Sequence, residues 1–221
     1  MIADGAASFG SFAMGRHSGK GATISCVSFN GNKVVTTGGG GAFLTDNEGL
    51  AERARKLAMH AREKGVCYQH QTIGYSSLLS NLGGAFGLAQ LSDLVRRIDA
   101  RRSIFHRYVE AMSSLPGIRW QQEAALARSN RWLTVVSLDE GWENIDIIGI
   151  CKTLRRGGIE VRPIWRPLHQ QAMFSGAPRS RVNNAERISA RGLCLPSGSQ
   201  LLPKDQAIVI DALMDSLSSG L

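Results

Sequence analysis

The 221-residue sequence predicts an α/β fold that ends in a small α+β domain. Short apolar runs that suit β-strands alternate with longer stretches in which apolar residues recur at helical spacing. The pattern also changes at Pro116-Gly117, where a long helical stretch stops and the order strand, helix, strand, helix follows. These observations predict two domains, residues 1–115 and residues 116–221.

The first half is expected to hold short strands and two helices. Residues 1–4 are typical of the end of a strand, and the runs "ISCVSF" (24–29) and "AFLTD" (42–46) suit strands. A helix then begins at Asp46 or Asn47, either of which can cap it. The apolar stripe expected on this helix consists of Leu50, Ala54, Leu57, Ala58 and Ala61.

A second helix is expected after the loop at residues 65–80, with Ser80 as its cap. The spacing predicts that this helix runs on through the basic segment to Leu115. The residues that it is expected to bury are Leu82, Ala85, Phe86, Ala89 and Leu94.

The second half is expected to fold as two strand–helix pairs. Residues 131–138 and 159–163 suit strands, and residues 144–156 suit a helix that stops at Gly157-Gly158. A loop rich in Pro, Trp and His follows. A closing helix opens near Pro203, since proline is tolerated in the first turn.

The net charge of +8 favours anionic partners such as nucleic acid, a membrane surface or a phosphorylated small molecule. The densest basic run, residues 95–108, has apolar residues at near-helical spacing, which favours an amphipathic helix with a solvated basic face. A nucleic-acid-binding helix is the less favoured alternative, because no known nucleic-acid module surrounds this run. Binding of nucleic acid is therefore not expected.

The chain shows no apolar run long enough for a membrane span and no secretory signal pattern, so a cytoplasmic protein without a membrane partner is expected. The four cysteines are widely scattered and form no C-x-x-C pair. Free thiols, some of them buried, are expected in place of a metal site or a disulfide framework.

The segment "SFNGNKVVTTGGGG" (28–41) admits three interpretations. A flexible glycine linker with a solvated lysine is the simplest. A phosphate-binding loop is weakly supported, because Lys33 precedes the glycines and the G-x-x-x-x-G-K-[ST] spacing is missing. The third interpretation makes Lys33 a lysine that bonds to pyridoxal phosphate, with Asp4 for the ring nitrogen and Ser28 for the phosphate. Asp4 and Ser28 both end apolar strand-like runs, where α/β proteins place ligand groups.

The segment "SFNGNKVVTTGGGGAFLTD" resembles the lysine segment of the DegT/StrS-type sugar aminotransferases, which are fold-type I enzymes that depend on pyridoxal phosphate. The resemblance continues in order along the chain. The other segments similar to that family are "IADGAASFGSFAMGRHSGK", "YQHQTIGYSSLLSNLGGAFGLAQL", "NRWLT", "VRPIWRPLHQQAMF" and "RGLCLPSGS". The resemblance implies that residues 1–115 belong to a large cofactor-binding domain with a mostly parallel sheet, and residues 116–221 to a small domain.

The resemblance also implies roles for individual residues. Lys33 matches the lysine that bonds to the cofactor, Asp4 the aspartate at the pyridine nitrogen, and Ser28 the serine at the cofactor phosphate. His169, in "RPLH", falls in a segment that the family places near the sugar nucleotide; a loop histidine packed beside Trp165 is the equal alternative.

The sequence departs from the family pattern at several positions. Ala7 stands where a polar residue often contacts the cofactor. The family's "GYNYR" reads "GYSSL", so that Ser76 replaces the asparagine that reaches the cofactor phosphate of the partner subunit, and Leu78 replaces an arginine. A serine can still donate one hydrogen bond. Few residues precede Asp4, so the chain is expected to be the C-terminal portion of such an enzyme.

The function that this resemblance implies is amino transfer. A pyridoxal-phosphate-dependent homodimer would pass an amino group from an amino acid, glutamate by resemblance, to a nucleotide-linked 4-keto-6-deoxy sugar for bacterial polysaccharide or glycan synthesis. The alternative is a catalytically inactive, truncated remnant of such an enzyme.

Overall fold

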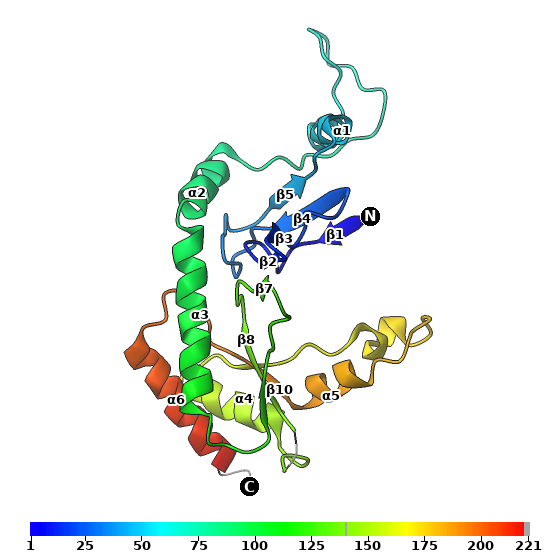
Figure 1. Cartoon of the computed structure of the whole chain (residues 1–221). Helices are drawn as coiled ribbons and strands as arrows, with labels where there is room; N and C mark the ends of the chain where they lie inside the picture. Colours follow the sequence, from blue (N-terminus) through cyan, green and yellow to red (C-terminus); the bar gives the residue numbers. More distant parts are fainter. Residues whose placement is uncertain (140, 219–221) are drawn as a thin grey trace. The chain divides into compact units, whose positions relative to one another are not determined.

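The computed structural model describes residues 1–139 and 141–218 (Figure 1). The chain divides into two compact units. The first unit consists of residues 1–99 and 123–132, and the second of residues 100–122 and 133–221. Each unit is therefore built from two separate stretches of the chain.

A three-stranded sheet with the order β1-β4-β5 forms the centre of the first unit. Its strands are β1 (Ile2–Asp4), β4 (Ile24–Ser28) and β5 (Gly41–Leu44). β1 and β4 are parallel, whereas β4 and β5 are antiparallel. The strands predicted at residues 1–4, 24–29 and 42–46 are thus confirmed to within a few residues.

A second small sheet in this unit has the order β3-β2-β7 and was not predicted from the sequence. Its strands are β2 (Phe12–Ala13), β3 (Arg16–His17) and β7 (Ala127–Arg128). Each strand has only two residues, which is too short for a periodic apolar pattern to show. The pairing of β2 with β7 brings residues near 127 next to the loop that follows β1.

Helix α1 (Glu48–Ala58) begins as predicted, because the side chain of Asn47 accepts a hydrogen bond of 2.9 Å from Leu50 N. No residue of α1 is buried. The predicted stripe residues within the helix, Leu50, Ala54, Leu57 and Ala58, are half-buried, so the expectation of a core-facing helix holds only in part.

Helix α2 (Asn81–Leu91) is capped by Ser80 as predicted, with Ser80 Oγ 3.1 Å from Gly83 N. The prediction that it buries its apolar residues is wrong. Leu82 is 82% exposed and Phe86 is 56% exposed. The residues of α2 that are buried are Gly87 and Gln90. The helix approaches Thr37 so closely at Gly87 that a Cβ atom there would lie only 2.8 Å from the Thr37 methyl group.

The predicted continuous helix from Ser80 to Leu115 is also wrong. The helix is interrupted at Ser92 and Asp93, and a new helix, α3 (Leu94–Ala111), begins there. Ile98, Ile104, Phe105 and Tyr108 are buried at the predicted helical spacing, whereas Val95 is 68% exposed. The basic face is not wholly solvated, since Arg101 is 7% exposed and donates a hydrogen bond of 2.9 Å to Ser197 O.

The second unit contains a four-stranded antiparallel sheet with the order β6-β8-β10-β9. Its strands are β6 (Ile118–Trp120), β8 (Thr134–Leu138), β9 (Arg162–Pro163) and β10 (Gly192–Leu195). The strand predicted at 131–138 is confirmed in its second part, whereas the one predicted at 159–163 is reduced to two residues. All four residues of β10 are buried, although the sequence did not predict this strand.

After α3, the helices of the second unit are α4 (Ile147–Arg156), α5 (Asn183–Arg191), α6 (Pro203–Ser218) and two short 3₁₀ helices, η1 (Leu168–Gln170) and η2 (Ala172–Phe174). Helices α3, α4 and α6 pack with this sheet around one core, whereas α5, η1 and η2 add no residue to that core. Helix α4 stops at Gly157 and Pro203 opens α6, as predicted, but α4 begins at Ile147, after its cap Asp146, and not at residue 144. Helix α5 was not predicted, because few of its residues are apolar.

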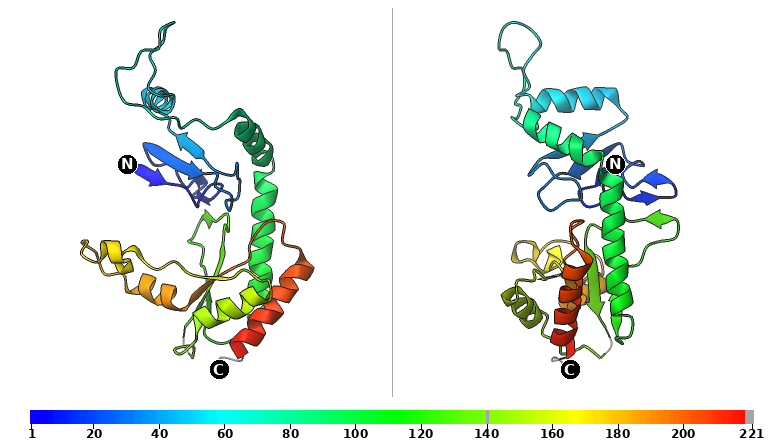
Figure 2. Two further views of the ribbon diagram at one scale, coloured as in Figure 1. Left: turned by 180° about the vertical axis from the view of Figure 1, so that it is seen from behind. Right: turned by 90° about the vertical axis from the view of Figure 1, so that its left-hand side faces the viewer.

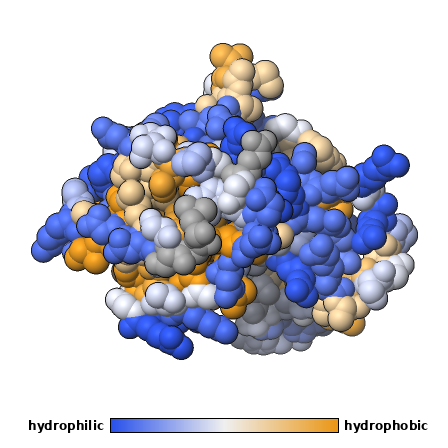
Figure 3. Space-filling model, turned by 90° about the horizontal axis from the view of Figure 1, so that it is seen from below, coloured by the Kyte–Doolittle hydropathy of each residue, from blue (hydrophilic) through white to orange (hydrophobic). Residues whose placement is uncertain are grey.

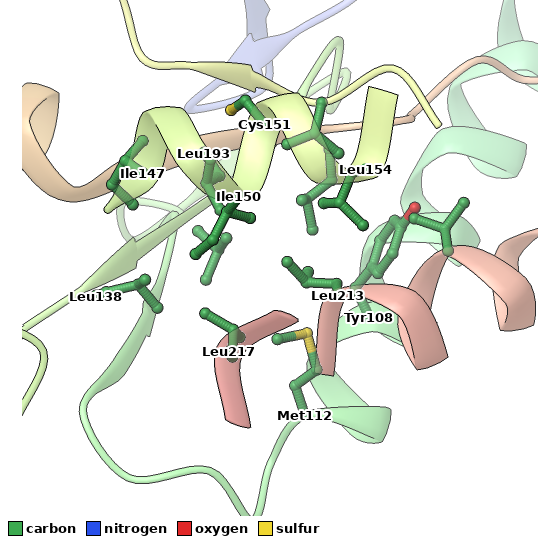
Figure 4. Packing of buried hydrophobic residues seen from close by; sticks show 14 of the residues in the cluster. Tyr108, Met112, Leu138, Ile147, Ile150, Cys151, Leu154, Leu193, Leu213 and Leu217 are labelled. Carbon is green, nitrogen blue, oxygen red and sulfur yellow. The ribbon is translucent and has the colours of Figure 1, made fainter. Parts of the chain in front are cut away.

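Figure 4 shows the core of this unit, where Leu193 of β10 lies among side chains of α3, α4 and α6. The hydroxyl of the buried Tyr108 donates a hydrogen bond of 3.0 Å to Pro196 O. Burial raises the pKa of Tyr108 above its ordinary range. Figure 3 shows one outer face of the molecule, where hydrophilic side chains surround smaller hydrophobic areas.

Candidate active site

The candidate site lies where β1 and β4 end. The two strands are parallel neighbours, with Asp4 opposite Cys26, so their carboxyl ends lie at the same edge of the sheet. Asp4 is the last residue of β1 and Ser28 is the last residue of β4. The chain then turns, with a hydrogen bond of 3.0 Å from Lys33 N to Asn30 O. This topology brings Asp4, which is distant in the sequence, to the same edge of the sheet as Ser28 and the turn that contains Lys33.

The amine of Lys33 is half-buried, and this burial lowers its pKa below the ordinary value for lysine. The charge of Asp4 opposes the shift, because a nearby carboxylate favours the protonated amine. Asp4 itself is exposed, and its Oδ1 accepts a hydrogen bond of 3.0 Å from Ala6 N. A larger fraction of neutral amine is therefore available at Lys33 than at a fully solvated lysine.

Residues 29–40, which we call the lysine loop, are held by several hydrogen bonds. Phe29 closes the loop, since its N–H donates to Gly40 O at 3.0 Å and its carbonyl accepts from Thr37 N at 2.9 Å. Gly38 and Gly40 adopt φ angles of +80° and +81°, which glycine reaches without strain. These two glycines therefore let the backbone turn tightly within the loop.

Helix α2 contacts the lysine loop through a hydrogen bond that its last turn accepts. The buried side chain of Gln90 accepts a hydrogen bond of 3.1 Å from Thr36 N. Val34 and Val35, the residues after Lys33, are both buried. The backbone on the C-terminal side of Lys33 is thereby anchored in the unit, and this restricts where its amine can lie.

Ser28 is placed to offer a hydroxyl at the same edge of the sheet. Its side chain is half-buried, and its Oγ accepts a hydrogen bond of 3.3 Å from Asn30 N. Because the hydroxyl accepts this bond, its proton can be donated to another group.

Ser76 lies elsewhere in the first unit, on the segment between α1 and α2 that projects as a long loop (Figure 2). It is exposed and pairs with Met59 in an isolated β-bridge. Ser76 and Leu78 line a groove of about 1250 Å³ between α1 and this segment. Lys33 does not line this groove, so Ser76 is not brought together with Asp4, Ser28 and Lys33 there.

His169 belongs to the second unit, in η1. Its side chain is largely buried, and its Nε2 lies 2.6 Å from Glu186 Oε1 of α5. This pair ties the loop after β9 to α5. The predicted role of His169 near a sugar nucleotide stays a prediction.

Trp132 is a member of the site that sequence reasoning did not assign. Lys33 Nζ lies 3.8 Å from the centroid of its ring. The indole Nε1 donates a hydrogen bond of 2.8 Å to Asn32 O, across 100 residues of sequence. The segment "NRWLT" resembles the family, but no local pattern in it indicates this long-range contact.

The residues at this edge fit the chemistry that pyridoxal phosphate requires. The Asp4 carboxylate suits the ring nitrogen of that cofactor, and the partly desolvated amine of Lys33 suits its aldehyde. The Ser28 hydroxyl, near the tight glycine turn, suits its phosphate. Within residues 1–139 and 141–218, no group of three or more His, Cys, Asp or Glu residues could hold a metal ion. None of the described helices has both the length and the apolar composition needed to cross a membrane.

Comparison with known proteins gave matches along nearly the whole chain. The DegT/DnrJ/EryC1/StrS aminotransferase family matches residues 1–214. The protein named as the pyridoxal phosphate-dependent aminotransferase EpsN of Bacillus subtilis (strain 168) is 42% identical over 218 residues, which are 97% of this chain and 55% of EpsN. The GDP-perosamine synthase of Caulobacter vibrioides is 30% identical over 214 residues, which are 96% of this chain and 57% of that protein.

Solved structures share the fold. The aminotransferase TlmJ from Streptoalloteichus hindustanus superimposes with a TM-score of 0.88 at 26% identity, and the match covers 99% of this chain and 58% of TlmJ. PseC from Helicobacter pylori has a TM-score of 0.89 at 19% identity, which shows the fold alone. The chain thus spans a little more than half the length of these relatives, and the fold-type I prediction is confirmed for that part.

Proposed function

The chain belongs to the DegT/DnrJ/EryC1/StrS aminotransferase family, and from this premise we propose that it provides the lysine-bearing part of a pyridoxal-phosphate-dependent aminotransferase. The observation that supports this most directly is the meeting of Asp4 and Lys33 at one edge of the sheet, close enough for the Asp4 charge to act on the amine. EpsN, named as a pyridoxal phosphate-dependent enzyme, matches nearly the whole of this chain.

Three side chains would hold the cofactor. Lys33 Nζ would bond to its aldehyde carbon, the Asp4 carboxylate would pair with the ring nitrogen, and Ser28 Oγ would donate to the phosphate. When bound, pyridoxal phosphate supplies a ring that withdraws electrons from the bonds around the reacting carbon. Ser76 is proposed as a further donor to a cofactor phosphate, as the family pattern implies for the partner subunit.

The two charged residues would then divide the proton chemistry. The lowered pKa of Lys33 keeps part of its amine neutral, so that Nζ can accept a proton from the α-carbon of the amino donor. The Asp4 carboxylate would keep the proton on the ring nitrogen. Both residues are positioned by backbone hydrogen bonds, which supports a fixed geometry for proton transfer.

We propose glutamate as the amino donor and a nucleotide-linked 4-keto-6-deoxy sugar as the acceptor, for the synthesis of a bacterial glycan. The names of the relatives support a sugar acceptor, since GDP-perosamine synthases are among them. The net charge of +8 suits a nucleotide diphosphate. His169 is proposed to lie near this substrate, in the pair that it forms with Glu186.

The proposed assembly is a cytoplasmic homodimer of chains that each contain a cofactor-binding domain, residues 1–115, and a small domain, residues 116–221. Sedimentation velocity of the purified chain would test the dimer. A single species at the monomer mass across the micromolar range would contradict it.

The cofactor proposal is tested by adding pyridoxal phosphate to the purified 221-residue chain, reducing with borohydride and mapping the modified lysine by mass spectrometry. We expect a new absorption band before reduction and one predominant label, on Lys33. The exposed Lys20, which pairs with Asp46 at 2.7 Å, is the reference for unspecific labelling.

The matched control is Lys33→Arg, which keeps the positive charge but cannot bond to the aldehyde. It should lose the band and the label while Lys20 labelling stays unchanged. Equal labelling of Lys33 and Lys20 in the unmodified chain would contradict the proposal and favour the alternative of a catalytically inactive remnant.

A further inference from the structure

The contact between Lys33 and Trp132 joins two distant parts of the first unit. Lys33 follows β4, whereas Trp132 ends the second stretch of the unit, residues 123–132. The Lys33 ammonium nitrogen lies over the face of the indole, 3.8 Å from the ring centroid. A cation at this distance is attracted to the negative face of an aromatic ring, and tryptophan is the best partner for it.

The indole is held in place by the chain on both sides. Its Nε1 donates to Asn32 O at 2.8 Å, which ties the ring to the residue before Lys33. The backbone N–H of Trp132 donates to Asn130 Oδ1 at 2.9 Å. The buried Asn130 in turn donates through Nδ2 to Ala7 O and Phe9 O, each at 3.0 Å.

These bonds connect the loop after Asp4, the segment before β8 and the lysine loop in one network. Asn130 holds the loop that begins at Asp4, and Trp132 holds the residues next to Lys33. The network therefore links the segment that follows Asp4 to the residue that precedes Lys33. A merely space-filling apolar side chain at position 132 could make neither the Nε1 bond nor the ring contact.

Three effects act on the protonation of the Lys33 amine. Burial disfavours the protonated amine, whereas the Asp4 charge favours it. The ring face also favours the protonated amine, because only the cation is attracted to it. Asp4 is the charged neighbour identified for this amine in the described chain.

We propose that Trp132 is a positioning residue for Lys33, whose indole face binds the ammonium group and whose Nε1 bond keeps the lysine loop beneath it. For its relevance to catalysis this rests on the proposed function, in which Lys33 bonds to a cofactor. The contact itself belongs to the chain alone and is measured without any cofactor.

The test compares Trp132→Leu with Trp132→Phe in the 221-residue chain. Trace acetylation with acetic anhydride is followed at a series of pH values, and labelling of Lys33 is divided by that of Lys20. Leucine keeps an apolar cover but removes the ring, so the protonated amine loses the stabilisation that the ring face provides and the pKa of Lys33 falls. Below the midpoint of the Lys33 profile, the ratio should rise about two- to fivefold.

Phenylalanine keeps an aromatic face and should stay closer to the unmodified chain than leucine does. This partial rescue separates the ring contact from a general loosening of the fold. Identical profiles for all three chains would overturn the proposal, as would an equal rise for phenylalanine and leucine.

A second measurement needs no destabilising change at Trp132. The indole ¹H–¹⁵N NMR signal of Trp132, assigned by its loss in Trp132→Phe, should shift with the same pH midpoint as Lys33 labelling. Lys33→Met should abolish that shift, and the indole signal of Trp120 should lack it in both chains. A Trp132 signal that does not respond at this midpoint would overturn the proposal.

The positioning role of Trp132 and the proposed function can be contradicted independently of each other. If the labelling and NMR results hold while pyridoxal phosphate does not attach to Lys33, the Trp132 contact stands and the proposed function falls. If the cofactor attaches to Lys33 equally in the unmodified and leucine chains, and their labelling profiles coincide, the positioning role falls and the proposed function stands.

Discussion

Asp4 is the residue whose charge acts on the pKa of the Lys33 amine. Its carboxylate raises the pKa of the amine against the larger, lowering effect of burial. In Asp4→Asn the size is kept and the charge is lost, so the pKa of Lys33 should fall further below its ordinary value. At a fixed pH below the midpoint, more amine is neutral, and Lys33 should be methylated faster by formaldehyde and borohydride.

The matched control for this change is Asp46→Asn. It removes the exposed carboxylate that pairs with Lys20, and Asp46 is not among the causes of the Lys33 shift. The Lys33 profile should be unchanged in that variant. A Lys33 midpoint that stays the same in Asp4→Asn would show that the two groups do not interact.

At the scale of single residues, the sequence predicted the site residues that lie at the ends of strands. Asp4 and Ser28 follow apolar runs, and a parallel pair of strands places their ends at one edge. Trp132 escaped prediction because its contact with the lysine loop depends on how residues 123–132 return to the first unit. Hydrophobic periodicity contains no information on such a return.

The junction between the lysine loop and β5 depends on glycine at one position more than at its neighbour. A Cβ atom built at Gly41 would lie 2.2 Å from Val27 O, on the backbone of β4. At Gly39 the same atom would meet nothing within 4 Å. Because a backbone carbonyl cannot swing away as a flexible side chain can, Gly41→Ala should separate β5 from β4 at this end.

We expect Gly41→Ala to lower the free energy of unfolding by about 1–3 kcal/mol, the usual cost of forced overpacking. Gly39→Ala should change it by less than about 0.5 kcal/mol, as for an open surface position. Urea unfolding followed by circular dichroism measures both. Equal stability of the two variants would mean that the register of β4 and β5 does not require this close approach.

At the scale of elements, the first residues of α1 and α2 were predictable from the sequence, whereas the face that a helix buries was not. Asn47 and Ser80 cap their helices through hydrogen bonds within three residues, so the local sequence contains the whole signal. The apolar pattern of α2 predicts a buried face of leucine, alanine and phenylalanine, yet the buried residues of this helix are Gly87 and Gln90. Gly87 lets the helix approach Thr37, a requirement that lies in another segment of the chain.

At the scale of the whole chain, the division into two units follows pairings that no local pattern specifies. β7 joins the small sheet of the first unit, whereas β8, a few residues later, joins the sheet of the second. The sequence predicted a boundary near residue 116, where Pro116-Gly117 ends a helix. A break in the helix is visible locally, but the return of residues 123–132 depends on tertiary contacts such as those of Asn130.

The four cysteines report on the two units separately. Cys26 and Cys67 belong to the first unit and are exposed, whereas Cys151 and Cys194 belong to the second and are buried. Burial raises the pKa of the Cys194 thiol to about 11 and also raises the pKa of Cys151. Since the thiolate is the nucleophile, the fraction of reactive Cys194 at neutral pH is about a hundredfold below that of a solvated thiol.

An aromatic disulfide reagent at pH 7.5 should therefore modify two thiols rapidly and two slowly. The slow pair should become reactive in the urea range where the second unit loses its near-ultraviolet circular dichroism, because only unfolding exposes Cys151 and Cys194 to solvent. Cys67→Ser should remove one rapid thiol and leave the slow phase unchanged. Four thiols of equal reactivity in the absence of urea would contradict the burial of Cys151 and Cys194 in the second unit.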